Sequence, residues 1–256
     1  MGWKLRVTLK SDATFARGEA LPGVVDQEVE HDPTTGLPFI RGRILKGLLV
    51  EECANILYSL AQANSSAARG MHRVAEFLFG SPGSTDLSQG ALHVGPALLP
   101  QELRSAVKEA VDKGDLRPDE VLESLTAVRR QTSVDSETGA PEEGSLRATR
   151  VVLRGTEFEA ELEFTRPFAE GKGSETDRSS AQGSVPAPGE EESLALLAAC
   201  VLAVRRGGLG RTRGRGRLEM RLEEDGRDVT LSYFEDFKKA CEGPKNGDTD
   251  VQGGAA

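Results

Sequence analysis

The segment Gly207-Gly208-Leu209-Gly210-Arg211-Thr212-Arg213-Gly214-Arg215-Gly216-Arg217 separates an apolar helical stretch at 194–204 from an alternating stretch at 218–222. The order helix, glycine-rich turn, strand is opposite to that of a Rossmann dinucleotide site, so the segment does not form one. Its glycines let the backbone follow the phosphates of a polymer, and arginines bind phosphate through forked hydrogen bonds. A flexible surface loop is the alternative, although crowded like charges are poorly tolerated without a partner. We predict phosphate contacts from Gly208, Gly210, Arg211, Arg213, Gly214 and Arg215.

The charge of the chain is distributed unevenly. The net charge of −9 over 256 residues argues at first against a nucleic-acid partner. However, six arginines and no acid lie between Arg205 and Arg217, whereas many acids lie in stretches typical of exposed loops. Because the local field decides phosphate binding, this region still favours an anionic polymer.

Cysteine usage and hydropathy indicate the compartment. The three cysteines are far apart and show neither metal-ligand spacing nor a disulfide framework, which favours a reducing environment. No apolar run is long enough to cross a membrane, and we expect no signal peptide. We therefore expect a cytoplasmic protein with no membrane partner.

The order of the expected elements indicates an α+β fold. A strand-like alternation at 3–9 is followed by a helical pattern at 43–60. This order fits a ferredoxin-like (RRM-like) split βαβ core with helical and β-hairpin insertions. Further along, strands are expected at 91–99, 146–153 and 157–164 (the last two pairing), then a helix at 194–204 and strands at 218–222 and 229–234.

A single domain is expected over residues 1–235. Its insertions lie near 61–130 and include a helix predicted at 118–128. The stretch 167–192 is poor in hydrophobic residues and rich in Ser, Gly, Pro and Glu, so we expect a mobile loop. By composition, we expect a disordered tail at 236–256.

A second basic segment, at 37–47, opens a helix. It places Arg41, Gly42, Arg43 and Lys46 around the first helical turn. A helix start exposes unpaired N–H groups and a partial positive charge, both of which suit a phosphate. An ordinary loop-to-helix junction with solvated basic residues is the alternative. We predict phosphate contacts from these four residues.

An acidic loop at 23–33 precedes that helix. Asp26, Glu28 and Glu30 share one face if the loop is extended, and such carboxylates can hold a hydrated Mg²⁺ or orient a ribose hydroxyl. A solvated acidic loop is the alternative. The three histidines form no readable constellation with other residues, and no metal ligands are assigned.

Together these segments resemble the repeat-associated mysterious protein (RAMP) superfamily of CRISPR systems, and within it the Cas7-type backbone subunits of type III effector complexes. Where that family has Pro-Gly-Ser-Ser, this chain has Arg41-Gly42-Arg43-Ile44, which favours a more electrostatic contact with RNA. The matching segments are 23–26, 31–40 and 42–47 at the N-terminal signature, 134–140 and 150–158 at the thumb hairpin and the next strand, and 208–216 at the C-terminal glycine-rich loop.

The resemblance implies a place in antiviral defence, with a guide RNA (crRNA), a complementary target RNA and other Cas subunits as partners. It implies that Gly42, Arg43, Lys46 and the loop 208–216 hold the guide backbone. The hairpin at 132–149 would press between guide and target. Asp26 would promote cleavage of the target RNA with Mg²⁺ or another divalent metal, which would make the chain an endoribonuclease within its complex.

Other functions stay open at this point. The chain can be a non-catalytic scaffold, or a large (Csx10-like) end subunit of a type III-D complex, in which Asp26 is only a loop carboxylate. It can also be a Cas6-like endoribonuclease that processes guide precursors. That group relies on a histidine, so His31 would have to serve.

Overall fold

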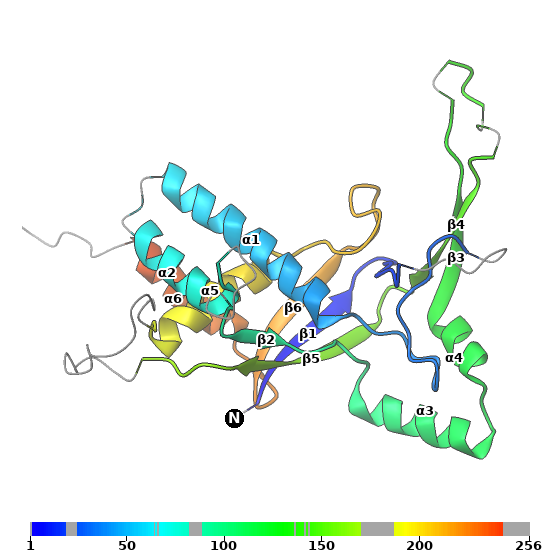
Figure 1. The fold of residues 1–256 in the computed structure, drawn as a ribbon, viewed down its shortest axis with the longest axis horizontal. Helices are drawn as coiled ribbons and strands as arrows, with labels where there is room; N and C mark the ends of the chain where they lie inside the picture. Colours follow the sequence, from blue (N-terminus) through cyan, green and yellow to red (C-terminus); the bar gives the residue numbers. More distant parts are fainter. Residues whose placement is uncertain are drawn as a thin grey trace, which may run out of the picture.

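The computed structural model contains a five-stranded antiparallel sheet in the order β2-β5-β1-β6-β7 (Figure 1). β1 pairs with β5 on one side and with β6 on the other, so it lies at the centre. The strands are β1 (Trp3–Leu9), β2 (Leu92–Val94), β5 (Glu157–Phe164), β6 (Leu218–Glu224) and β7 (Arg227–Asp228). The structure describes residues 2–18, 25–63, 65, 67–81, 89–135, 137–140, 142, 144–169 and 187–242.

Helices α1 and α5 cover one face of the sheet, and α2 and α6 pack beside them (Figure 1). Along the chain, β1, α1, β2, β5, α5 and β6 come in the order strand–helix–strand–strand–helix–strand, which is that of a split βαβ unit. The predicted α+β class is therefore confirmed. The helix bounds are α1 (Gly42–Gln62), α2 (Ala68–Phe79), α5 (Glu190–Ala203) and α6 (Thr230–Glu242).

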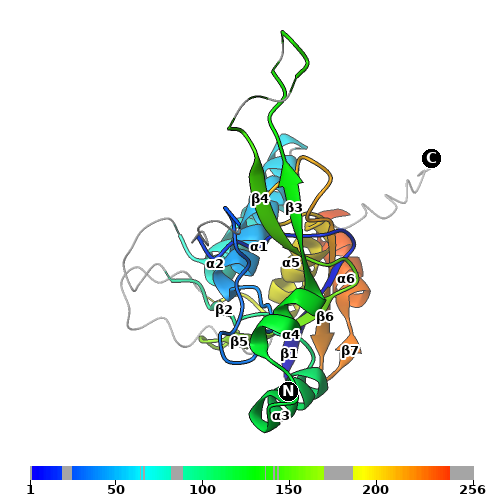
Figure 2. The same ribbon diagram turned by 90° about the vertical axis from the view of Figure 1, so that its right-hand side faces the viewer.

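Two helices and a hairpin are inserted between β2 and β5 (Figures 1 and 2). Helices α3 (Gln101–Lys113) and α4 (Pro118–Leu125) lie at one end of the sheet. The hairpin of β3 (Thr126–Gln131) and β4 (Arg147–Val152) projects away from the body. Its base is fixed by two backbone hydrogen bonds between Ala13 and Val152, of 2.8 and 3.1 Å. The body of the protein therefore positions the base of the hairpin.

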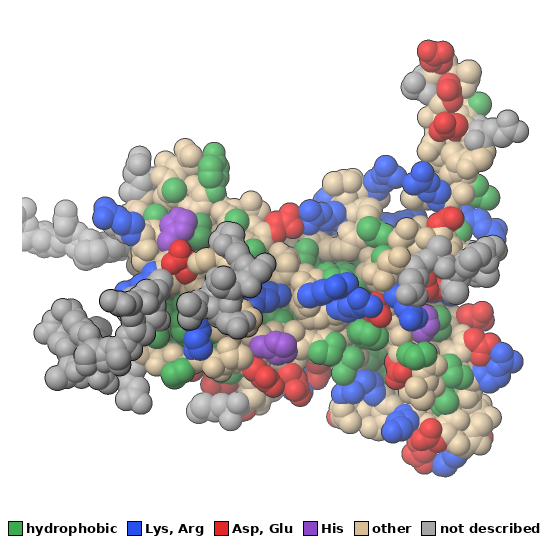
Figure 3. Space-filling model, viewed as in Figure 1, with side chains coloured by type: hydrophobic (Ala, Val, Ile, Leu, Met, Phe, Trp, Pro, Cys, Tyr) green, Lys and Arg blue, Asp and Glu red, His purple; other side chains and the backbone are tan. Residues whose placement is uncertain are grey.

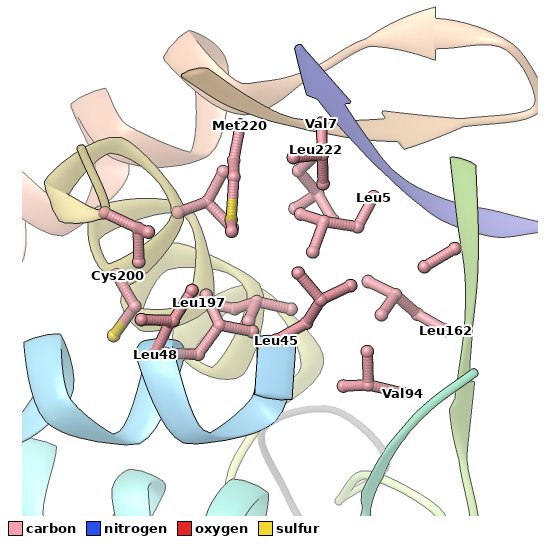
Figure 4. Close-up of a cluster of buried hydrophobic side chains, with 14 of the residues drawn as sticks. Leu5, Val7, Leu45, Leu48, Val94, Leu162, Leu197, Cys200, Met220 and Leu222 are labelled. Atoms are coloured by element: carbon pink, nitrogen blue, oxygen red, sulfur yellow. The ribbon is translucent and has the colours of Figure 1, made fainter. Parts of the chain in front are cut away.

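The core lies between the inner face of the sheet and helices α1 and α5 (Figure 4). Alternate residues of β1 are buried there because successive side chains of a strand point to opposite faces. Burial of each large aliphatic side chain contributes about 1.5–3 kcal/mol. The labelled core residues are Leu5, Val7, Leu45, Leu48, Val94, Leu162, Leu197, Cys200, Met220 and Leu222.

The open face of the sheet carries charge. Lys4 and Arg6 of β1 lie among glutamates of the two neighbouring strands, and Arg6 Nε lies 2.6 Å from Glu223 Oε1. RNA-binding sheets of the RRM type stack bases on aromatic side chains, whereas this face presents carboxylates. A nucleic-acid site on this sheet is therefore disfavoured. The outward carboxylates are Glu157, Glu159, Glu161, Glu163, Glu219 and Glu223.

The strand expected at 229–234 is wrong, because helix α6 begins at Thr230. Asp228 Oδ1 accepts hydrogen bonds from the backbone N–H and the hydroxyl of Thr230, at 3.0 and 2.7 Å, which fixes the first turn. The alternating residues that suggested a strand include Leu231, which is 66% exposed. Helix α6 also extends to Glu242, so residues 236–242 are helical and do not belong to a disordered tail.

The pairing expected for 146–153 with 157–164 is also wrong. β4 pairs with β3, and β5 pairs with β1 and β2. The helix expected at 118–128 ends at Leu125, and its last three residues start β3. Local alternation identifies strands, but the partner of each strand depends on the rest of the fold.

Parts of two expected segments lie outside the described residues. These are 170–186 of the loop expected at 167–192, and 243–256 of the expected tail. Residues 190–192 of that loop form the first turn of α5, where their carboxylates complement the helix dipole. None of the helices in the described ranges combines the length and apolar character that a bilayer crossing requires.

Candidate nucleic-acid interface

Residues 207–217, named here the Gly-Arg loop, form a pinned turn between α5 and β6. Its two ends are joined by an isolated bridge between Arg206 and Arg217 and by the hydrogen bond from Gly207 N to Gly216 O, 2.9 Å long. A Cβ atom on Gly216, where φ is +69°, would lie 2.0 Å from Gly207 O. Gly214, at φ +82°, has open space around it. The glycine at the neck is therefore required by packing, and the one near the tip leaves the backbone accessible.

The arginines of the Gly-Arg loop differ in what they contact. The guanidinium of Arg211 makes a forked pair with Glu51 of α1, at 2.8 and 3.0 Å, and this pairing raises its pKa. Within the part of the chain that the structure describes, the side chains of Arg213 and Arg215 have no hydrogen-bond or ion-pair partner. These two arginines are therefore available to an external anion.

A groove of about 530 Å³ separates the Gly-Arg loop from the β3–β4 hairpin. Among the described residues that line it there are arginines and no acid. In the space-filling view, Lys and Arg side chains gather around the base of the hairpin, and acids mark its tip (Figure 3). The groove is lined by Gln27, Gln131, Arg147 and Thr149 on the hairpin side and by Gly210, Arg213 and Arg215 on the loop side.

Asp12 connects the two walls of the groove. Its Oδ2 accepts hydrogen bonds from the guanidinium of Arg129 on β3, at 2.8 and 3.1 Å. Its Oδ1 accepts from the backbone N–H of Arg154, and its backbone oxygen accepts from Gly216 N at 2.9 Å. Asp12 therefore bonds to both walls and helps to set the distance between the Gly-Arg loop and the hairpin.

The groove contains residues that the sequence did not reveal. Arg147 and Gln27 line it, yet they lie far from the Gly-Arg loop in the chain. The sequence signal that could have indicated Arg147 is the series of arginines at 147, 150 and 154, whereas no sequence signal indicates Gln27. Arg147 is the most important addition, because it supplies a third cation with no partner in the described ranges.

The predicted phosphate site at the start of α1 has other contacts. A Cβ atom on Gly42 would lie 1.9 Å from Val94 O, so this glycine allows the helix to approach β2. Lys46 Nζ donates to Leu92 O at 2.8 Å, and burial lowers the pKa of Lys46. Arg43 is exposed. Gly42 and Lys46 thus have structural explanations, so we expect Lys46 to contribute little to RNA affinity.

Arg41 is held by the acidic loop. Its guanidinium lies 2.7 Å from Glu30 Oε2, and Glu30 is buried. This contact is an ion pair without hydrogen-bond geometry, because the same oxygen has no hydrogen-bond partner in the described residues. Arg41 therefore neutralises a buried carboxylate, and the α1 start offers an incoming phosphate little free charge besides Arg43.

Asp26 is exposed and is joined to the hairpin. Its backbone N–H donates to Ala148 O at 2.8 Å, and its Oδ2 accepts from Ala148 N at 2.7 Å. The next residue, Gln27, forms a parallel bridge with Thr149 and lines the groove. Asp26 therefore precedes a residue that lines the groove, and its Oδ2 is engaged by the hairpin.

Glu28, two residues after Asp26, also contacts the hairpin, but it is buried. It is 2% exposed and pairs with Arg150 of β4, whose Nε lies 2.8 Å from Glu28 Oε1. Arg150 also donates to Thr126 Oγ1 at 3.2 Å. Glu28 and Glu30 are therefore not free to hold a hydrated cation together with Asp26, because both are buried in ion pairs with arginines.

The described residues contain no group of three or more His, Cys, Asp or Glu side chains that could hold a metal ion. Among the described carboxylates of the acidic loop, that of Asp26 is the exposed one, and it contacts the hairpin. Mg²⁺ retains several waters and is often bound by one or two carboxylates together with substrate phosphates. Asp26 therefore fits a metal site that an RNA phosphate completes, and not one made by protein alone.

Comparison with known proteins gives a family and a fold. The family model described as the RAMP superfamily matches residues 7–219. A solved structure of a type III-B Cmr-beta complex bound to cognate target RNA contains a similar chain, with 14% identity and a TM-score of 0.54. That match covers 87% of this chain and 97% of the other. No curated protein matches.

A second structure, of type III-B Cmr-beta in the apo state, gives a TM-score of 0.56 at 14% identity. This match covers 89% of the present chain and 99% of the matched one. At such low identity the likeness concerns the fold, which the two chains share over nearly their whole length.

Proposed function

This chain belongs to the RAMP superfamily, and from that premise we propose that it is a guide-RNA-binding backbone subunit of a type III CRISPR effector complex in antiviral defence. The groove between the Gly-Arg loop and the hairpin carries the proposal, because Arg147, Arg213 and Arg215 line it without partners in the described residues. The similar chains come from Cmr-beta complexes, one of them bound to cognate target RNA, which supports RNA and other subunits as partners.

The groove suits the backbone of an RNA strand more than its bases. Arginines and accessible glycine backbone bind phosphates, and such contacts carry no sequence information. Aromatic side chains, on which exposed bases stack, do not occur among the described residues that line the groove. A subunit that must hold any guide sequence requires this kind of contact. Guide affinity should therefore fall steeply with salt.

We further propose that Asp26 promotes cleavage of the target RNA. It lies beside Gln27, which lines the groove, and Ala148 N fixes one carboxylate oxygen. A divalent cation such as Mg²⁺ would supply charge stabilisation at the scissile phosphate. The Ala148 hydrogen bond would orient Asp26, leaving its Oδ1 for that cation or for the attacking hydroxyl.

A non-catalytic scaffold is the second candidate. The observation that favours it is the isolation of Asp26, since Glu28 and Glu30 are buried in ion pairs and cannot help to bind a metal. An end subunit of a type III-D complex would have the same properties. A Cas6-like activity is less supported, because His31 is half-buried and its Nδ1 lies 3.0 Å from Val29 O.

The test compares assembled particles that contain wild-type, Asp26→Ala or Asp26→Asn chains, with Mg²⁺ and complementary RNA. Asparagine retains an oxygen for the Ala148 hydrogen bond and removes only the charge, so it separates chemistry from loop structure. We expect cleavage to fall by at least about 100-fold in both variants, with target binding unchanged. Unchanged cleavage would assign the reaction to another subunit and leave this chain as a scaffold.

A further inference from the structure

A second basic recess borders the Gly-Arg loop and shares no described lining residue with the groove. It has a volume of about 890 Å³ and lies among the C-terminal end of α5, the loop and β6. Gly214 lines this recess, whereas its neighbours Arg213 and Arg215 line the groove. The loop is therefore a ridge between two basic surfaces. The cations of the recess are Lys10, Arg205, Arg206 and Arg217, above a floor that includes Val204 and Met220.

Two arginines of the recess, Arg206 and Arg217, lie directly opposite each other. The antiparallel bridge between them places both side chains on the same side of the ladder. Like charges in directly opposite positions are destabilising. Arg206 Nη1 donates to Arg211 O at 3.1 Å, whereas no described residue pairs with the side chain of Arg217.

Little negative charge in the recess offsets these cations. Glu219 is the one acid among the described lining residues, and it is shared by Lys10, at 2.8 Å, and Arg221, at 2.7 Å. Their hydrogen bonds lower its pKa. Arg205 and Arg217 have no side-chain partner in the described ranges. The recess thus retains two free guanidinium groups that an anion would bring together.

We propose that this recess is a second phosphate site for the RNA strand held in the groove. The strand leaves the groove, crosses the Gly-Arg loop at Gly214, where no side chain obstructs it, and places its next phosphates on Arg205 and Arg217. The described lining contains no aromatic side chain, so the site reads backbone and not sequence. This inference rests on the proposed function and extends the RNA path to both sides of the loop.

The test measures binding of fluorescent single-stranded RNA of random sequence to the full chain, with lengths of about 4 and about 16 nucleotides, the range of single-strand site sizes. For the double variant Arg205→Ala/Arg217→Ala, we expect affinity for the long RNA to fall on the order of tenfold. The slope of log affinity against log salt should fall by about 1.4, since each single-strand phosphate contributes about 0.7. Affinity for the short RNA should not change. Lys238→Ala with Lys239→Ala is the control, because it removes the same charge on α6.

Two results would overturn the second site. One is that the double variant Arg205→Ala/Arg217→Ala binds the long RNA like the wild type, while the double variant Arg213→Ala/Arg215→Ala binds both RNAs more weakly. The proposed function would then stand. The other is a lower melting temperature of the RNA-free variant than of the control, which would make these arginines structural. If the Arg213 and Arg215 variant binds both RNAs like the wild type, the groove and the proposed function fail instead.

Discussion

The start of α1 and the Gly-Arg loop combine the same ingredients, glycines and basic side chains, and use them differently. At the start of α1, Gly42 lies against the backbone of β2, and the Lys46 ammonium donates to a strand carbonyl. In the Gly-Arg loop, Gly214 faces open space, and Arg213 and Arg215 have no partner in the described residues. One segment anchors a helix to the sheet, and the other presents free cations beside a groove.

This difference shows what a glycine-and-arginine pattern can and cannot indicate. The pattern identifies places where the backbone is closely approached, but it does not say whether the approaching group is a strand or a phosphate. The surroundings decide. Lys46 already donates to a backbone carbonyl and a buried carboxylate neutralises Arg41, whereas the described lining of the groove contains no acid that could neutralise Arg213.

The largest expected effect comes from the glycines of α1. Gly42→Ala would place a Cβ atom 1.9 Å from Val94 O, so we expect unfolding free energy to fall by about 3 kcal/mol or more. Gly47→Ala, in the same helix with nothing within 4 Å, should raise it by about 0.5–1 kcal/mol. Chemical denaturation measures both. Equal stability of the two variants would show that Gly42 is not required by packing.

A smaller difference in unfolding free energy is expected between variants that remove the ion-paired arginine of each region. Arg41→Ala would leave the buried Glu30 carboxylate unpaired and should lower the unfolding free energy by about 2 kcal/mol. Arg211→Ala leaves the exposed Glu51, which water solvates, so we expect no measurable change. Thermal unfolding of the two variants at one pH checks this. A larger loss for Arg211→Ala would contradict the assignment of structural and surface roles.

Much of the fold could be predicted from residue spacing. The bounds of α3, at 101–113, follow from two local signals: Pro100 precedes the helix, and Gly114, at φ +80°, ends it. The strand at 229–234 could not be excluded, since Val229, Leu231 and Tyr233 alternate as in a strand. Only the hydrogen bonds of Thr230 to Asp228 show that a helix starts there.

The candidate site was predictable only where one segment contains it. The Gly-Arg loop is visible in the sequence because its glycines and arginines are consecutive. The opposite wall is not, because it depends on the partner of β4 and on the contacts of Asp12 with both walls. For the same reason the burial of Glu28 by Arg150, more than a hundred residues away, could not be read from an acidic loop.

The most direct test of the groove measures the RNA affinity of two variants against that of the wild-type chain. One is the double variant Arg213→Ala/Arg215→Ala (the loop variant), and the other is Lys46→Met. The loop variant loses two free cations, so we expect affinity to fall by about 10- to 100-fold for every sequence. Lys46→Met removes an ammonium that already donates to Leu92 O and should change affinity less than about twofold. If Lys46→Met weakens binding more than the loop variant does, the guide strand lies at the start of α1 and the account is wrong.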